Sequence, residues 1–178
     1  MSEVLTWSET TSPIERAQGF HALGLRHTYN TSSDDLTTDF FLPLLSQAIS
    51  YDRGVGYFSS GWLRVNAQGL AQLAMRGGKA RWVVSPQLSR EDLETFNRIA
   101  DLQQSPRHIS RLMRTVNELK TALEKDTRNT MAWMVADGLL DFRFAVPVDN
   151  LFGDFHDKFG IFRDEWGHRV SFLGSYNE

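Results

Sequence analysis

The chain has 178 residues, a formal net charge of -3 and no cysteine. Its length predicts one domain with a core that needs no cross-links, and the lack of cysteine excludes disulfides and zinc sites built on thiolates. The negative charge argues against a protein that coats nucleic acid, because such proteins carry a strong basic excess. It leaves room for a nuclease with a local basic face.

The two ends of the chain give little sign of targeting. The N-terminus lacks a basic start followed by an apolar run, and no stretch is long and apolar enough to span a membrane. We therefore expect a cytoplasmic protein without a membrane partner. Residues 1–33 lack a regular pattern and are expected to form an arm or an extra edge element, and residues 34–178 are expected to form the main domain.

From residue 34 onward, helical and strand patterns alternate. The patterns predict helices over residues 36–50, 61–75, 89–103, 106–125 and 129–137, and strands over residues 54–58, 80–84 and 140–146. Two further aromatic-rich strands are expected near the C-terminus. This alternation favours an α/β fold with a mixed, largely parallel sheet flanked by helices. Gly54 and Gly56 indicate close backbone packing, because their spacing is too short for a dinucleotide fingerprint.

The most specific pattern lies in the last two dozen residues. His156 and Lys158 are two positions apart, so on a β-strand their side chains leave the same face. The segment from Asp164 to His168 is typical of a hairpin turn, in which Gly167 can take a positive φ.

The hairpin should bring a second set of polar residues beside this pair. Gly174 and Ser175 are small and let backbone approach a phosphate, while Asn177 offers a neutral donor. An imidazole, an ammonium, a hydroxyl and an amide together are suited to holding a phosphate and attacking it.

His156-x-Lys158, followed across a hairpin by Gly174-Ser175-x-Asn177, resembles the His-Lys-Asp signature of the phospholipase D superfamily. The segment from Tyr51 to Trp62 is similar to the first core strand and following helix of phospholipase D-like nuclease domains. These domains precede DEAD/DEAH-type helicases in restriction and phage-defence proteins. The resemblance implies a phospholipase D-like sandwich, a catalytic domain over residues 34–178, and a helicase domain C-terminal to it.

One position departs from the family pattern. The family places its aspartate where this chain has Arg163, and Asp164 comes one residue late. A carboxylate that accepts from the Nδ1 of a catalytic histidine commonly orients the ring. Here that carboxylate could be Asp164, Glu178 or a residue beyond the end of this chain. The late position of Asp164 also fits a residue that supports the turn rather than the chemistry.

The resemblance implies a chemistry that needs neither metal nor cofactor. A neutral His156 attacks phosphorus, while Lys158 and Asn177 hold the non-bridging oxygens. A second histidine must protonate the leaving group, and the cheapest source is an identical chain across a two-fold axis. We therefore expect a homodimer with one shared site.

Alternatives remain open at this point. We expect DNA as the substrate, but RNA and phospholipid also fit the motif. A non-catalytic DNA-binding or dimerisation module of a helicase is the main competing interpretation. Glu118-Leu119-Lys120 matches the Glu-x-Lys of metal-dependent nucleases, but it falls in a helical pattern, where such a pair is ordinary.

Overall fold

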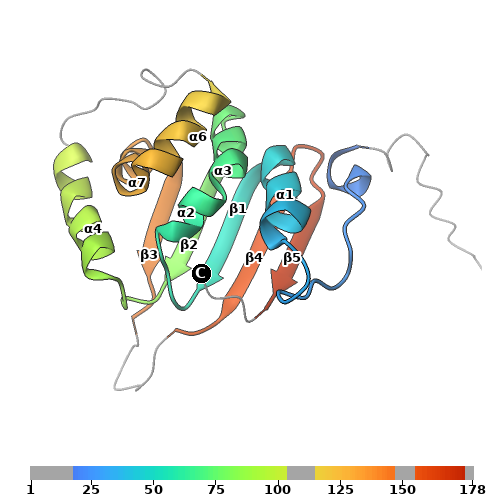
Figure 1. Ribbon diagram of the computed structural model, residues 1–178, viewed down its shortest axis with the longest axis horizontal. Helices are drawn as coiled ribbons and strands as arrows, with labels where there is room; N and C mark the ends of the chain where they lie inside the picture. Colours follow the sequence, from blue (N-terminus) through green and yellow to red (C-terminus); the bar gives the residue numbers. More distant parts are fainter. Residues whose placement is uncertain (1–17, 104–114, 147–154, 175–178) are drawn as a thin grey trace, which may run out of the picture.

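The computed structural model describes residues 18–103, 115–146 and 155–174. It contains one five-stranded sheet in the order β3-β2-β1-β4-β5 (Figure 1). The strands are β1 (Ala48–Val55), β2 (Lys79–Val84), β3 (Leu140–Phe144), β4 (Lys158–Asp164) and β5 (Arg169–Leu173). The pairs β1–β2 and β2–β3 are parallel, whereas β1–β4 and β4–β5 are antiparallel. The α/β class with a mixed sheet is confirmed, but the sheet is only partly parallel.

The described helices cover one face of this sheet, the face toward the viewer in Figure 1. They are η2 (Gly19–Ala22), η3 (Thr37–Phe41), α1 (Leu42–Gln47), α2 (Gly61–Val65), α3 (Ala67–Met75), α4 (Arg90–Gln103), α6 (Val116–Lys125) and α7 (Thr127–Ala136). None of them is long and apolar enough to cross a membrane. Because the helices lie on one side in the described ranges, the phospholipase D-like sandwich stays a prediction.

The largest error in the predicted boundaries concerns the first helix and strand. The predicted helix over residues 36–50 ends at Gln47, because Ala48 already has extended backbone with φ -70° and ψ 148°. Strand β1 then pairs with β2 on one side and β4 on the other. Hydrogen bonds to two neighbours outweigh a local helical pattern, since propensity is a weak preference that tertiary context overrides. The predicted strand over residues 54–58 therefore begins too late.

Local signals predicted the other elements better. Asp92 donates its backbone N–H to the hydroxyl of Ser89 at 3.1 Å, as expected for a cap at the start of α4. The predicted stop of α3 is confirmed, with Gly77 at φ 74°. The predicted helix over residues 61–75 is split into α2 and α3 at Asn66, whose side-chain amide donates to the carbonyl of Trp62 at 3.1 Å.

Aromatic side chains fill the space between the sheet and the helices. Tyr51 on β1 and Phe162 on β4 are fully buried, and their rings stack with centroids 4.1 Å apart. The guanidinium of Arg53 lies 4.4 Å from the ring centroid of Trp62 and donates to the Tyr51 hydroxyl at 2.9 Å. Such ring contacts add to area burial, so β1 and β4 are held firmly against each other.

Candidate functional site

The candidate site lies where strand β4 begins. Lys158 is the first residue of β4 and pairs with Val55, the last residue of β1. On the other side, Gly174 directly follows β5 and donates its N–H to the carbonyl of Lys158 at 3.0 Å. The carboxyl ends of β1 and β5 therefore flank Lys158. Open α/β sheets commonly bind ligands at the carboxyl ends of their strands.

The ammonium group of Lys158 is held almost out of solvent. The residue is 7% exposed, and its Nζ donates to the backbone carbonyl of His156 at 2.8 Å. Within the described ranges Lys158 forms no ion pair and no second hydrogen bond. A lysine buried this deeply is ordinarily paired with an acid. Two of its three N–H donors therefore have no partner among the described residues.

His156 lies just outside the strand, and its side chain is exposed. Strand β4 begins at Lys158, two residues later than the prediction required. The alternation of strand side chains therefore does not place His156 beside Lys158. The loop after β1 positions its backbone instead. A Cβ added at Gly56 would lie 2.6 Å from the Cα of His156 and 2.7 Å from the carbonyl oxygen of Phe155. The absence of a side chain at Gly56 lets the two segments touch, as its sequence suggested.

Asp164 lies at the opposite end of β4. Six residues separate it from Lys158, which corresponds to about 20 Å along an extended strand. Its carboxylate accepts from the backbone N–H of Phe20 at 2.9 Å, of Trp166 at 3.1 Å and of His168 at 2.8 Å. The Nδ1 of His168 is 2.9 Å away. The structure therefore places Asp164 in the hairpin turn and does not bring it to His156.

The protonation of Asp164 follows from these contacts. Burial acts to raise the pKa of this carboxyl, but hydrogen bonds from Phe20 and His168 favour the charged form more strongly. The pKa of Asp164 is consequently lowered from its ordinary value. The hairpin itself forms as predicted, with Gly167 at φ 85°. Asp164 ties this turn to the N-terminal segment through Phe20.

Ser175, Asn177 and Glu178 lie outside the described residues. The structure places only the start of their motif, because the N–H of Gly174 reaches the carbonyl of Lys158. The chain thus leaves β5 directly beside the candidate site, as the hairpin predicted. The roles of the three residues after Gly174 stay predictions.

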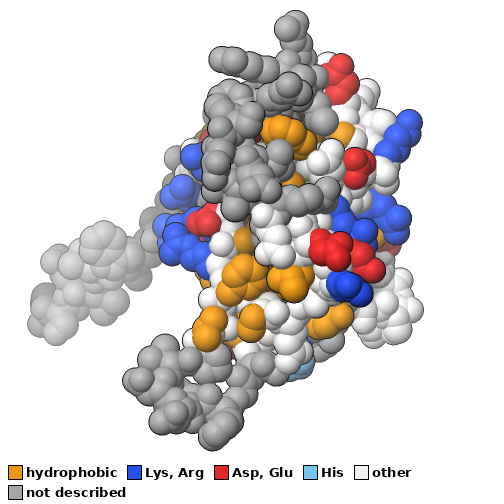
Figure 2. All heavy atoms as spheres, turned by 90° about the vertical axis from the view of Figure 1, so that its left-hand side faces the viewer, with side chains coloured by type: hydrophobic (Ala, Val, Ile, Leu, Met, Phe, Trp, Pro, Cys, Tyr) orange, Lys and Arg blue, Asp and Glu red, His pale blue; other side chains and the backbone are white. Residues whose placement is uncertain are grey.

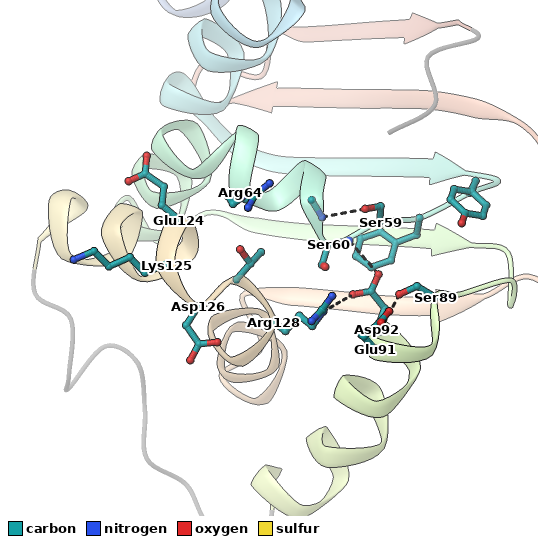
Figure 3. A pocket seen from close by; sticks show the side chains of 14 residues that line it. Ser59, Ser60, Arg64, Ser89, Glu91, Asp92, Glu124, Lys125, Asp126 and Arg128 are labelled. Atoms are coloured by element: carbon teal, nitrogen blue, oxygen red, sulfur yellow. Dashed lines mark hydrogen bonds and ion pairs between the residues drawn. The ribbon is translucent and has the colours of Figure 1, made fainter.

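A hollow of about 520 Å³ opens beside the loop that follows β1. Figure 3 shows the buried carboxylate of Asp92 between Ser60 and Arg128. Asp92 accepts from the Ser60 N–H at 3.3 Å and lies 3.5 Å from the Nε of Arg128. These contacts join α4 and α7 to the loop that contains Gly56. Asp92 thereby supports the segment against which His156 packs.

The Glu-x-Lys of the metal-dependent alternative lies in the described part of the chain. No group of three or more histidine, aspartate or glutamate side chains is arranged there to hold a metal ion. Glu118 and Lys120 lie on helix α6, as their pattern indicated. The carboxylate of Glu118 accepts from the Thr115 N–H at 3.0 Å in a capping box, and Lys120 pairs with Glu124 at 2.9 Å. Both side chains serve the helix.

A row of cations on the open face of the sheet was not predicted from the sequence. Lys79, Arg163 and Arg169 are exposed there, on three different strands. The signal was present, because a hairpin with its turn at residues 164–168 sets Arg163 opposite Arg169. Only the pairing of β1 with both β2 and β4 brings Lys79 into the same row.

Comparisons of the chain with models of known protein families, with curated proteins and with solved structures found no match. The function proposed below therefore depends on the residues around the start of β4 and on their geometry. The resemblance to the phospholipase D superfamily adds the motif to that geometry.

Proposed function

We propose that this chain is a metal-independent phosphodiesterase domain that cleaves DNA through a phosphohistidine intermediate. The observation that carries the proposal is the buried ammonium of Lys158, which has no carboxylate partner among the described residues and donates to the backbone carbonyl of His156, a residue with an exposed side chain. A phosphate would satisfy the remaining donors of Lys158 by charge-assisted hydrogen bonds. The ammonium would also offset the charge that develops on the phosphoryl oxygens in the transition state.

The reaction has two displacements at phosphorus. The neutral imidazole of His156 attacks, a bond between its ring nitrogen and phosphorus forms, and the bond from phosphorus to one ester oxygen breaks. A second histidine donates a proton to the leaving oxygen. That histidine then removes a proton from water, which attacks phosphorus and releases His156. Ser175 and Asn177 are proposed to contact the phosphate from the segment after Gly174.

The second histidine is proposed to come from another copy of the chain. Large apolar side chains are exposed near the end of the sheet where His156 lies: Tyr57, Phe144, Val146 and Leu173. Figure 2 shows apolar side chains gathered in the lower half of the flank formed by β3 and α4. Exposed apolar groups of this kind mark contact surfaces. A two-fold contact at this end would bring both His156 side chains to one phosphate.

The biological setting follows from the resemblance alone. A domain of this kind would act in the cytoplasm, in restriction or phage defence, linked to a helicase. DNA is the proposed substrate, and RNA is the nearest alternative. Both carry the phosphodiester that the site would bind.

The decisive experiment incubates the chain with single- and double-stranded DNA in excess chelator. The wild type should cleave, and His156→Ala should abolish cleavage. His27→Ala is the matched control, because His27 is exposed and distant in sequence from the motif. Cleavage that persists in His156→Ala would refute the assignment of the nucleophile, and cleavage that requires added magnesium would refute the metal-independent mechanism.

The shared site has its own test. Wild-type and His156→Ala chains are mixed and reassociated at random. If each site needs both histidines, activity falls as the square of the wild-type fraction. A straight line, or full activity in a species that light scattering shows to be a monomer, would contradict the shared site.

One observation favours the alternative of a non-catalytic DNA-binding or dimerisation module. Within the described ranges, no hydrogen bond or ion pair orients the imidazole of His156, and Asp164 is engaged in the hairpin. Catalytic histidines are ordinarily oriented by a carboxylate or carbonyl. DNA binding by the wild type without cleavage under any condition, retained in His156→Ala, would establish this module.

A further inference from the structure

The face of the sheet that the helices leave open carries a row of polar side chains across four strands. Strand pairing sets Lys79 on β2 beside Ser50 on β1, Ser50 beside Arg163 on β4, and Arg163 beside Arg169 on β5. Three strand spacings make this row roughly 14 Å long. The four side chains line a hollow of about 960 Å³.

The three cations of this row have no acidic partner in the part of the chain that the structure describes. Within the described ranges, none of Lys79, Arg163 and Arg169 forms an ion pair or a side-chain hydrogen bond. The neighbouring Arg81 differs, because its guanidinium binds both carboxylate oxygens of Asp52 at 2.7 and 2.6 Å. Arg81 is therefore neutralised by its own partner, whereas the row remains free to bind an anion.

Arg163 and Arg169 face each other directly on antiparallel strands. Like charges in this position destabilise a sheet. The repulsion would be relieved by an anion that accepts hydrogen bonds from both guanidinium groups, and a phosphate does this well. The repulsion between the two arginines thus raises the free energy of the face without a ligand, and a bound phosphate would lower it.

The charge of the whole face supports an anionic partner. Strand alternation places five basic and two acidic residues on it: Lys79, Arg81, Arg143, Arg163 and Arg169 against Asp52 and Asp141. The chain as a whole has a formal net charge of -3. Figure 2 shows basic side chains on both margins of the flank, including the margin that faces away from the helices. The charge of this face is therefore complementary to that of a polyanion, although the chain as a whole is acidic.

An aromatic ring completes the surface. Phe159 on β4 is 36% exposed, and its ring lies over the backbone of Gly54, where any Cβ would collide with it. The ring therefore lies against the open face with part of its surface in solvent. Exposed aromatic rings on a sheet stack with the bases of single strands, whereas the bases of a duplex are stacked on each other and cannot be reached.

We propose that the open face binds single-stranded nucleic acid, with phosphates along the row of Lys79, Arg163 and Arg169 and a base on Phe159. This surface is separate from the site at His156 and Lys158, because strand alternation puts Lys158 on the helix side of β4 and these residues on the other. The inference therefore does not require the nuclease activity. It assigns the chain a second nucleic-acid contact, which would hold a strand whether or not cleavage follows.

The test measures binding of a fluorescein-labelled oligothymidylate by anisotropy over a range of salt concentrations. All proteins carry His156→Ala, so that cleavage cannot interfere. The double variant Arg163→Gln/Arg169→Gln should bind more weakly, and the slope of log affinity against log salt should fall by roughly 1.4, which corresponds to two lost phosphate contacts on a single strand. The control Arg90→Gln/Lys120→Gln removes two cations from α4 and α6, each in an exposed helical ion pair, and should leave the slope unchanged.

Phe159→Leu separates stacking from charge. It should weaken binding about 5-fold or more, because base stacking on an aromatic ring is lost, without changing the salt slope. An unchanged slope in the double arginine variant would overturn the proposal. Equal affinity for an oligoglutamate of matched length would replace nucleic acid by an acidic protein segment, and equal affinity for duplex DNA would remove the role of Phe159. If the wild-type chain fails to cleave DNA, that result contradicts only the nuclease proposal and leaves the binding proposal unaffected.

Discussion

The two ends of strand β4 carry buried charges of opposite sign, and the two charges differ in how many hydrogen-bond partners they have. Asp164 at one end accepts three backbone hydrogen bonds and contacts the ring of His168. Lys158 at the other end has one partner in the described structure, the carbonyl of His156. Both side chains lie on the same face of the same strand. The fold supplies hydrogen-bond donors for the carboxylate, whereas two N–H donors of the ammonium have no partner in the described structure.

This contrast separates structural from functional charge. A buried group whose partners all come from the fold contributes to stability, and its loss should be measured as unfolding. A buried cation without an acidic partner costs stability and has a purpose only if an anion arrives. Asp164, placed one residue late for the family motif, belongs to the first kind. We propose that Lys158 belongs to the second.

The largest expected effect is on turnover. Lys158→Met should raise the activation barrier for DNA cleavage by about 2 to 4 kcal/mol, because it removes a hydrogen-bond donor to the transition state. The free energy of unfolding should change by less than about 1 kcal/mol, because methionine fills a similar volume without an unpaired charge. Rates and denaturant unfolding are measured on the same protein. Unchanged turnover, with Lys125→Met as the exposed control, would make Lys158 a structural residue.

The opposite result is expected at the other end of the strand. Asp164→Asn should lower the free energy of unfolding by about 2 to 3 kcal/mol. Hydrogen bonds to a charged group are lost, and the side-chain amide nitrogen of asparagine, itself a donor, faces backbone N–H donors. Turnover per folded molecule should stay the same. Urea unfolding and active-site titration measure the two quantities. A variant as stable as the wild type but inactive would show that Asp164 serves catalysis after all.

The pH dependence of stability sharpens the same comparison. The folded state lowers the pKa of Asp164, so its contribution is complete above the ordinary carboxyl pKa of about 4. The contribution is lost as pH falls through the lowered folded pKa. The difference in unfolding free energy between the wild type and Asp164→Asn should therefore be constant near neutral pH and shrink below about pH 4. A difference that stays constant in acid would contradict the lowered pKa.

Gly56 tests how the loop after β1 positions His156. A methyl group there would meet the backbone of His156 at 2.6 Å, so Gly56→Ala must displace one of the two segments. We expect a cost of about 1 to 3 kcal/mol, shared between stability and turnover. Gly61→Ala is the control, because its nearest neighbour is the hydroxyl of Ser59 at 3.1 Å, which can rotate away. Turnover and stability that both match the control would show that the contact does not matter.

The smallest expected effect is a gain in stability. Arg163→Gln removes one of two like charges that face each other across β4 and β5, and should stabilise the fold by about 0.2 to 1 kcal/mol at low salt. The gain should vanish in molar salt, where charges are screened within about 3 Å. Thermal unfolding at both salt concentrations provides the measurement. A variant that loses stability at low salt would show that the two arginines do not repel each other.

Particular residues show how far the sequence could be interpreted. The cap at Ser89, the stop at Gly77 and the turn at Gly167 were predicted, because each depends on a few neighbouring residues. The start of β1 at Ala48 was not, because it depends on hydrogen bonds from two strands that are distant in the chain. The same limit applied to the site. The motif pointed to Lys158, but its burial and its single carbonyl partner could not be inferred from spacing.

The sequence by itself determined the α/β class, most helix ends, the hairpin and the pairing of Lys158 with Gly174. These features depend on side-chain chemistry and on the repeat of helix or strand over a few residues. Tertiary structure alone decided that Asp164 joins the hairpin to Phe20, that Lys158 is buried without an acid in the described structure, and that Lys79 joins Arg163 and Arg169. Burial and strand order arise from contacts between distant segments, and a local pattern carries no information about which distant segment arrives.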